Sequence, residues 1–456
     1  MKNVLNYIES EKERYLSELI TFLKIPSISG LPEHNKDTVR AAEWLTNHLQ
    51  QIGLDNARIF ETAGHPIVYA EWLELQDAPT VLIYGHYDVQ PVDPLELWKT
   101  KPFDPVVKNG KIWGRGTSDD KGQVFTHIKS IEAYLRNGGK LPVNIKLLIE
   151  GEEEAGSSHL GDFISENKDM LAADTVLISD TEWFADGLPS ICYALRGISF
   201  VEVKVTGPNR DLHSGTFGGA VDNPINVLCN MISKLKSNAG VINIPGFYDD
   251  VLDLTQEERD GFKKLPFSED KYMNDLGVNA LSGEIGYTTL ERTWTRPSLD
   301  LNGIKGGFIG EGAKTVLPSH AIAKISMRLV PNQRTKDISY KIEKYLKQIA
   351  PKTVKLDVNL LHGGNPVIAP RDNNAVQAGM QALEEAFGTK PVFMREGGSI
   401  PITEVFASVL NIPSVLMGLG LPGDNIHSPN ENFDLNNYYG GIKASAIFFE
   451  KFAKTR

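Results

Sequence analysis

The chain has 456 residues, a length that suggests two or three domains, and 41% hydrophobic with 23% charged residues indicate a globular protein. Its 47 basic and 58 acidic residues give a net charge of −11. This balance argues against nucleic acid and anionic membranes as partners, because both bind to basic faces. The chain also has no apolar run near the roughly 18 residues of a membrane span.

The N-terminal residues and the cysteines indicate the cellular compartment. Residues 1–15 are rich in Glu and Lys and lack an apolar stretch, so we expect no signal peptide. The cysteines, Cys192 and Cys229, have no CxxC spacing and are most simply thiols in a reducing environment. We therefore predict a cytoplasmic protein.

The first part of the chain predicts helices and buried strands. Residues 1–24 have helical apolar spacing that ends before Pro26, and residues 37–53 predict a second helix that ends at Gly53. Short apolar runs then alternate with helical patterns; the clearest runs are residues 80–84, 143–149, 175–178 and 414–417. This alternation predicts an α/β fold with a mostly parallel sheet flanked by helices.

A different pattern begins at Gly197. Residues 199–205, 321–329 and 353–360 alternate between apolar and polar, which predicts strands with one exposed face. Helical patterns occupy residues 223–236, 336–349 and the neighbourhood of 255–264, within an otherwise polar and irregular stretch, 243–300. We predict an α+β block at 197–370 that is inserted into an α/β domain formed by 1–196 and 371–456.

Acidic residues and histidines follow each buried strand. His86 and Asp88 come after the first strand, Glu152–Glu154 after the second, Asp180 after the third, and His427 beyond the fourth. Open α/β sheets bind ligands at the carboxyl ends of their strands, so we expect these side chains to converge. Alone, each has an ordinary explanation: a satisfied polar residue, a solvated acidic face or a helix cap. Their coincidence favours a metal site.

A glycine-rich turn at residues 114–122 adds Asp119 and Asp120 to this set. The two carboxylate oxygens of Asp119 could bridge two cations, which would then lie about 3.5–4 Å apart. Imidazoles and carboxylates without thiolates fit Zn²⁺, Mn²⁺ or Co²⁺. Asp88 could orient the His86 ring, and one of the adjacent glutamates could bind metal while its neighbour serves as a general base.

Several motifs in this order resemble those of the M20 metallopeptidases, and the dipeptidase branch, with its carnosinase-like enzymes, is the most similar. The motifs are Gly85–Pro91, Trp113–Gly122 and Glu150–Ser157, followed by Asp211–Gly215, Gly312–Val316, Arg328–Pro331 and Arg395–Pro401. The resemblance covers almost the whole chain. It implies a catalytic domain formed by 1–196 and 371–456, and a lid that also makes the dimer interface at 197–370.

The resemblance also implies roles for individual residues. His86 and Asp180 would hold one divalent metal, Glu154 and His427 the other, and Asp119 would bridge them. Glu153 would be the general base, and Asp88 would orient the His86 ring without binding metal itself. The Asp119–Asp120 peptide bond matches one that is cis in the family.

The lid would supply the remaining groups. His213 matches a histidine that enters the partner subunit's site and stabilises the oxyanion, although without the resemblance a surface turn is the simpler interpretation. Arg328 and Ser399 match positions that hold the substrate's carboxylate, and a guanidinium fork suits that task. Gly398 lies in the same motif as Ser399, and Thr315 and His362 are further candidates for the substrate pocket.

The resulting hypothesis is a homodimeric exopeptidase with two divalent metals per subunit, Zn²⁺ or Mn²⁺, that hydrolyses dipeptides or other short peptides. Glu153 would take a proton from a metal-bridging water and return it to the leaving amine. One alternative is an N-acyl-amino-acid amidohydrolase or a carboxypeptidase on the same scaffold. A more distant alternative is a non-catalytic binding protein that retained the fold.

Overall fold

The computed structural model describes residues 1–398 and 400–455, and these residues form two compact units. Unit 1 comprises Met1–Tyr193, Ala369–Met394 and Val405–Arg456, and unit 2 comprises Ala194–Ile368 and Arg395–Glu404. Residues 395–404 thus cluster with unit 2, although we expected the whole of 371–456 to continue the first domain.

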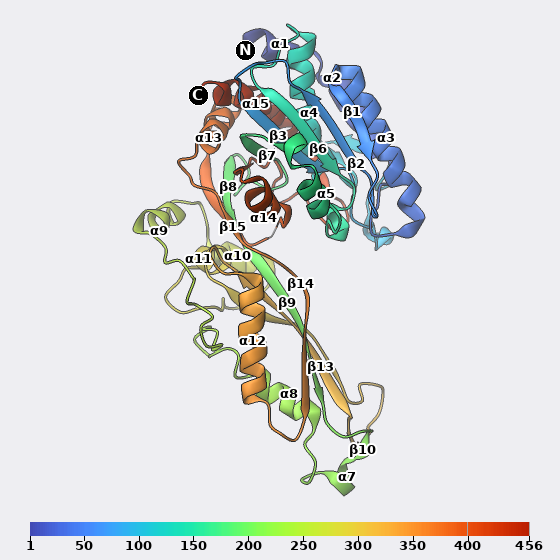
Figure 1. The fold of residues 1–456 in the computed structure, drawn as a ribbon, viewed down its shortest axis with the longest axis vertical. Coiled ribbons are helices and arrows are strands. Elements are labelled where there is room, and N and C mark those ends of the chain that lie inside the picture. Colours follow the sequence, from blue (N-terminus) through green and yellow to red (C-terminus); the bar gives the residue numbers. More distant parts are fainter. Residues whose placement is uncertain (399, 456) are drawn as a thin grey trace. The chain divides into compact units, whose positions relative to one another are not determined.

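The main sheet of unit 1 has parallel strands at its centre (Figure 1). In spatial order its first seven strands are β1 (Asp55–Phe60), β2 (Ile67–Trp72), β6 (Asn144–Glu150), β3 (Thr80–His86), β7 (Thr175–Ile178), β17 (Ser414–Leu416) and β8 (Ser190–Leu195), and the short strands β15 (Val367–Ile368) and β16 (Val392–Glu396) pair with β8. Strands β6, β3, β7 and β17 are parallel, whereas β1, β2 and β8 pair antiparallel at the sides. The predicted α/β fold with a mostly parallel sheet and helices around it is confirmed.

Both faces of this sheet are covered. Val81 and Ile83 of β3 belong to a core cluster with one set of helices, whereas Tyr84 packs edge-on against Phe406 at 5.4 Å. The first set is α1 (Lys2–Ser10), α2 (Lys12–Leu23), α3 (Asn35–Ile52), α4 (Lys121–Arg136), α13 (Asn374–Phe387) and α15 (Leu435–Ala453). Coverage on both sides explains why the strand sequences are apolar throughout rather than alternating.

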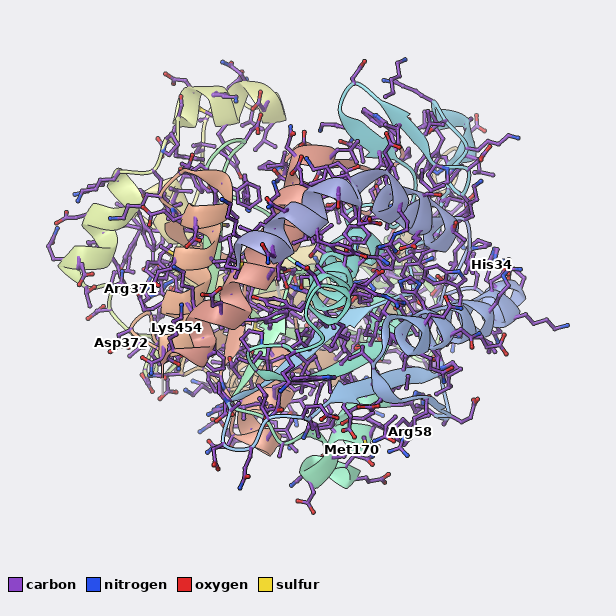
Figure 2. The ribbon with its side chains drawn as sticks, turned by 90° about the horizontal axis from the view of Figure 1, so that it is seen from above. His34, Arg58, Met170, Arg371, Asp372 and Lys454 are labelled. Carbon is purple, nitrogen blue, oxygen red and sulfur yellow. The ribbon has the colours of Figure 1, made fainter. Side chains whose placement is uncertain are left out.

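The edge strand β1 carries charged side chains. Arg58 lies 4.6 Å over the ring of Phe60, and its guanidinium donates to the sulfur of Met170 at 3.4 Å (Figure 2). Met170 belongs to α6 (Lys168–Leu171), which follows α5 (Leu160–Glu166). A charged group on an exposed edge discourages pairing with a strand of another molecule.

Of the two predictions for the N-terminal helices, one is wrong and one is confirmed. The apolar spacing over residues 1–24 predicts one helix, but Glu11 (φ −102°, ψ 7°) separates α1 from α2. The second helix, α3, ends as expected at Gly53, whose φ of +100° is a left-handed conformation that glycine adopts without steric cost.

Short elements complete unit 1. They are η1 (Pro32–His34), η2 (Leu95–Leu97), η3 (Glu153–Ala155), η4 (Phe406–Leu410) and the strands β4 (Val106–Lys108), β5 (Lys111–Trp113) and β18 (Asn432–Asp434), which form a small sheet of order β18–β5–β4. No helix among the described residues is both long enough and apolar enough to cross a membrane.

Unit 2 contains an antiparallel sheet with one face open to solvent. Its order is β11 (Ser298–Gly306), β13 (His320–Leu329), β9 (Gly197–Thr206) and β14 (Lys355–Gly364). Residues of β9 alternate strictly between buried and half-buried, and the buried ones pack against α8 (Pro224–Ile232) and α12 (Thr335–Ile349). The predicted strands with one exposed face are therefore confirmed.

The polar stretch 243–300 has more structure than its sequence suggests. The helix expected near 255–264 is α9 (Gln256–Lys263), which begins at a capping box made by Thr255 and Glu258. Two further helices, α10 (Glu269–Leu276) and α11 (Thr289–Trp294), were not predicted. The other short elements are β10 (Leu212–His213), α7 (Ser214–Phe217), β12 (Val316–Leu317), β15 (Val367–Ile368), β16 (Val392–Glu396) and α14 (Ile402–Val405).

Candidate metal centre

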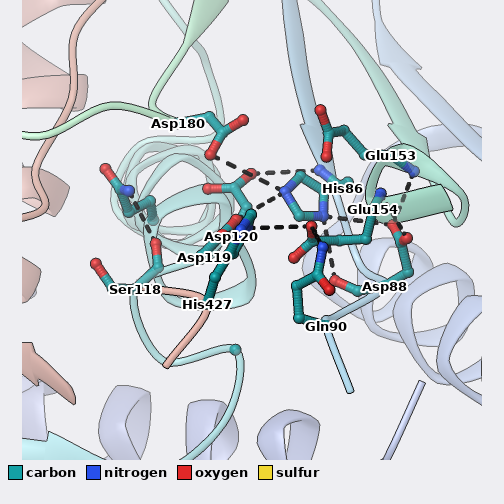
Figure 3. Close-up of polar contacts among 12 residues, drawn as sticks. His86, Asp88, Gln90, Ser118, Asp119, Asp120, Glu153, Glu154, Asp180 and His427 are labelled. Atoms are coloured by element: carbon teal, nitrogen blue, oxygen red, sulfur yellow. Dashed lines mark hydrogen bonds and ion pairs between the residues drawn. The ribbon is translucent and has the colours of Figure 1, made fainter. Parts of the chain in front are cut away.

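The carboxyl ends of the parallel strands bring the expected side chains together in unit 1. His86 is the last residue of β3, Glu153 and Glu154 lie in η3 just after β6, and Asp180 follows β7. Asp119 lies two residues before the start of α4, and His427 lies in the loop after β17. Figure 3 shows these side chains facing one another across a small volume.

Two groups of potential metal ligands share Asp119. In the first, His86 Nε2 lies 3.1 Å from Asp119 Oδ1 and 4.0 Å from Asp180 Oδ1. In the second, His427 Nε2 lies 2.8 Å from Asp119 Oδ2 and 3.2 Å from Glu154 Oε2. Within each group the donor atoms all lie within 4.8 Å of one another. Asp119 therefore directs one oxygen to each group, as a bridging ligand would.

Asp88 supports both sides of this arrangement. Its carbonyl oxygen accepts from His86 Nδ1 at 3.1 Å, and its Oδ1 lies 3.3 Å from the same nitrogen. The same carboxylate accepts from the backbone N–H groups of Glu153 (3.2 Å) and Glu154 (3.0 Å). The contact with Nδ1 leaves Nε2 of His86 directed at Asp119, so one buried carboxylate orients an imidazole and the start of η3.

The site concentrates negative charge. Burial raises the pKa of Glu153 to about 7, opposed in part by His86, and burial also raises the pKa of Glu154. Burial and the neighbouring Asp120 and Asp119 raise the pKa of Asp180 well above its usual range. Hydrogen bonds to Asp119 and Glu154 raise the pKa of His427 to about 10. Each shift indicates that the carboxylates need positive charge nearby.

The chain itself supplies little of that charge. Among the described residues, no lysine or arginine forms an ion pair with Asp119, Glu154 or Asp180. Imidazole nitrogens and carboxylate oxygens, arranged as two groups around a shared aspartate, fit two divalent cations such as Zn²⁺ or Mn²⁺. The residues present therefore suit the metals that the sequence suggested.

Gln90 and Glu431 also contact the site but were not identified from the sequence, and Asp120, which was added to the set of candidate ligands, belongs to neither ligand group. Gln90 donates to Glu154 Oε2 at 2.7 Å, and Asp120 Oδ2 accepts from the backbone N–H of His86 at 3.3 Å. Buried Glu431 accepts several hydrogen bonds from the turn that carries Asp119. The signal for Gln90 was its position two residues after Asp88 on an extended segment. The Asp119–Asp120 peptide bond is cis, as expected.

Four of the candidate substrate residues in unit 2 lie in two places. His213 and Thr315 meet where β10 pairs with β12: the backbone N–H of Ser214 donates to Thr315 O at 3.1 Å, and both side chains are exposed. Arg328 and His362 lie on the half-exposed face of the main sheet of unit 2, opposite Ile198 and Phe200 of β9. His362 also packs against the ring of Phe200 at 5.0 Å.

The loop after β16 contains the other two candidates. Gly398 is exposed, and Ser399 lies outside the described residues. The carbonyl of the preceding Gly397 accepts from Arg196 Nε at 3.2 Å, and burial together with the charge of Arg328 lowers the pKa of Arg196. Burial lowers the pKa of Arg328, and Asp300 opposes that shift. This part of unit 2 thus concentrates guanidinium groups that could face an anion.

An α/β sheet whose strand ends hold two carboxylate–imidazole groups, with a half-buried glutamate beside them, is an arrangement typical of two-metal hydrolases. The sequence matches Peptidase family M20/M25/M40 over residues 82–451, and the chain belongs to this family. The resemblance found from the motifs alone is confirmed.

Characterised relatives cover the chain almost completely. The Cys-Gly metallodipeptidase dug1 of Schizosaccharomyces pombe is 34% identical, over 98% of this chain and 97% of its own. The crystal structure of human carnosine dipeptidase 1 superposes with a TM-score of 0.82 at 33% identity, covering 99% of this chain and 98% of that one. A metallo-carboxypeptidase of the M20 family from Sulfolobus solfataricus gives a TM-score of 0.86 at 34% identity, covering 96% and 99%.

Proposed function

We propose that the protein is an exopeptidase that hydrolyses the peptide bond of dipeptides or other short peptides with two divalent metal ions per subunit. The observation that carries this proposal is the pair of ligand groups that share Asp119, with Glu153 next to Glu154. The dipeptidase names of two full-length relatives, one of them a metallodipeptidase, support the reaction type.

In this proposal His86, Asp119 and Asp180 hold one ion, and Asp119, Glu154 and His427 hold the other. Bound there, the ions would act as Lewis acids that polarise the scissile carbonyl and favour ionisation of the attacking water. Zn²⁺ and Mn²⁺ are the two candidates, and elemental analysis of the purified protein distinguishes them.

Glu153 is the proposed general base. It accepts the proton of the attacking water and returns it to the nitrogen of the leaving amine, so that one carboxylate serves both halves of the reaction. In the chain without metal, burial raises the pKa of Glu153, so the site favours proton uptake by this carboxylate. Asp88 keeps the backbone of Glu153 in place through the hydrogen bond to Oδ1.

Unit 2 is the proposed lid and dimer-forming domain. His213 would reach the site of the partner subunit and stabilise the oxyanion, and Arg328 would bind the free carboxylate of the substrate, helped by Ser399, Gly398, Thr315 and His362. The guanidinium groups near Gly397 support the carboxylate-binding role. Light scattering tests the dimer, and cell fractionation tests the proposed cytoplasmic location.

The first experiment is hydrolysis of a dipeptide panel by metal-stripped protein, with Zn²⁺ or Mn²⁺ added back, beside Glu153→Gln. We expect metal-dependent cleavage and a kcat about 10²–10⁴-fold lower in the variant. Glu152→Gln is a matched control, because that neighbouring carboxylate accepts from the backbone N–H groups of His65 (3.0 Å) and His159 (2.9 Å) and lies in a structural contact. Its kcat should stay within about tenfold of the parent.

A second candidate function is favoured by one comparison. The similarity to a metallo-carboxypeptidase is as high as that to the dipeptidases, so a carboxypeptidase or N-acyl-amino-acid amidohydrolase remains the alternative. The same panel should include N-acetyl-amino acids and N-blocked dipeptides. Cleavage of blocked substrates but of no free dipeptide would replace the proposal with this alternative, and a protein that binds no divalent metal would defeat both.

A further inference from the structure

A carboxylate that belongs to neither ligand group organises the turn that carries Asp119. Glu431 is fully buried, four residues after His427. Its Oε1 accepts from the backbone N–H groups of Ser118 (2.9 Å) and Asp119 (3.1 Å). Its Oε2 accepts from the backbone N–H of Gly116 (3.0 Å) and from Arg115 Nη1 (2.8 Å). Both oxygens therefore receive a pair of donors.

The turn is shaped to receive an anion. Gly116 has a φ of +82°, and this bend lets its own N–H and those of Ser118 and Asp119 point to one place. Converging backbone N–H groups of this kind form a cavity for a negatively charged group. Here the chain fills the cavity with its own glutamate, so the turn has a fixed shape before any metal arrives.

Glu431 also connects this turn with its own loop and with the segment after β3. Its backbone carbonyl accepts from the N–H of Gly114 at 3.0 Å, next to the pairing of β18 with β5. Arg115, held by the Glu431 carboxylate, donates through Nη2 to Pro91 O at 2.9 Å, three residues after Asp88. The segments that bear Asp88, Asp119 and His427 thus meet at a single buried ion pair.

We propose that Glu431 is a positioning residue that sets Asp119 between the two ligand groups and so preorganises the metal centre. This inference rests on the proposed two-metal function. A carboxylate is required because it offers acceptor positions to all four donors, whereas a glutamine would present an NH₂ group to half of them in either orientation. The unsatisfied donors would then move the turn, and Asp119 with it.

The test compares Zn²⁺ affinity, measured by competition with a chromogenic chelator, between the parent and Glu431→Gln. We expect a 10–100-fold weaker affinity for Zn²⁺, which is the usual effect of removing a residue that positions the metal ligands through hydrogen bonds. The matched control is Glu132→Gln, which removes a buried carboxylate of the same unit that pairs with Arg14 Nη1 (2.8 Å) and Lys129 Nζ (2.8 Å). This control should melt at a lower temperature in the metal-free state but keep the parent's affinity for Zn²⁺.

Glu431→Asp covers the case in which Glu431→Gln does not fold. The shorter side chain keeps the charge but cannot reach both pairs of donors, so its Zn²⁺ affinity should be intermediate. Folded Glu431→Gln, or in its absence folded Glu431→Asp, with the parent's Zn²⁺ affinity would overturn the positioning role. A Zn²⁺ affinity reduced equally in Glu132→Gln would do the same, since general destabilisation would then explain the loss. If the parent binds no divalent metal, the proposed function itself fails.

Discussion

Unit 1 contains two places where histidine and carboxylate side chains gather, and they differ in the source of positive charge. At the metal centre no described lysine or arginine pairs with the ligand carboxylates. In the second place, formed by Glu18, His48 and Glu132, the donor atoms also lie within 4.8 Å of one another. Geometry and residue types alone would describe both as metal sites.

The second cluster already holds its cation. The buried Lys129 Nζ lies 2.7 Å from His48 Nε2 and 2.8 Å from Glu132 Oε2, and it also contacts Glu18. Arg14 adds a second positive group to the same carboxylates. Burial and Lys129 lower the pKa of His48 to about 4, so the ring is neutral and accepts from the ammonium. A candidate metal site is therefore recognised by the charge that the chain leaves uncompensated.

The largest effect is expected when the negative charge of Asp119, which both candidate ligand groups share, is removed. Asp119→Asn takes the negative charge from both groups, so the number of Zn²⁺ ions bound should fall from two to one or none. The remaining affinity should drop by more than the 10–100-fold typical of residues behind the ligands. Equilibrium dialysis with elemental analysis measures both quantities.

The control for Asp119→Asn comes from the second cluster. Glu18→Gln removes a carboxylate from a group of the same composition, yet the Zn²⁺ stoichiometry should remain two because that cluster binds lysine rather than metal. A stoichiometry of two in Asp119→Asn, or a lower one in Glu18→Gln, would contradict the distinction between the clusters.

The next effect concerns stability. Lys129→Met leaves buried Glu132 without one of its positive partners, and breaking a buried pair in this way costs about 3–5 kcal/mol in the free energy of unfolding. Urea denaturation of the metal-free protein measures it. Since the donors around the vacated position then resemble the metal centre, added Zn²⁺ should recover part of the loss.

An exposed ion pair provides the reference for Lys129→Met. Lys347 pairs with Glu343 on the surface of α12, and surface pairs of this spacing contribute about 0.3–0.5 kcal/mol. Lys347→Met should therefore change stability little and gain nothing from Zn²⁺. Equal losses in the two variants would show that the cluster around Lys129 is not a buried charge network.

The contrast between the clusters also explains what the sequence could predict. The candidate ligands of the metal centre lie at the ends of apolar strands, where the rule for open α/β sheets places them at one edge, so His86, Asp180 and the run Glu152–Glu154 could be found from local pattern, whereas only the family resemblance singled out Glu154 within that run. The motifs of the M20 family gave the same residues. The strand-and-helix alternation likewise identified the parallel sheet.

Residues that act only through tertiary contacts could not be found in this way. Glu431 lies between two asparagines in a loop, where an acidic residue ordinarily faces solvent, and its partners lie more than 300 positions away in the sequence. Lys129 occurs on a helix, where lysine usually marks the exposed side, and His48 lies on another helix. Their burial depends on how α2, α3 and α4 pack together, which no local pattern encodes.

The smallest expected effect is the release of protons when metal binds, and it distinguishes the histidines of the metal centre from His48 of the second cluster. Hydrogen bonds to Asp119 and Glu154 raise the pKa of His427 to about 10, so in the metal-free protein this ring carries a proton at pH 7. Although burial opposes it, hydrogen bonds to Asp119 and Asp88 also raise the pKa of His86. A metal binds neutral imidazole, so these protons must leave when the metal enters.

The apparent affinity for Zn²⁺ should therefore depend on pH. Because protons compete with the metal, the apparent Zn²⁺ affinity should rise as the pH is raised from about 6 to 8, and binding at pH 7 should release about one to two protons per subunit. Calorimetry in two buffers of different ionisation enthalpy counts the released protons. The second cluster should behave differently. In Lys129→Met, burial still lowers the pKa of His48, so Zn²⁺ that enters this cluster should release no proton from the ring. Binding to the parent without proton release would mean that His86 and His427 are not the groups the metal contacts.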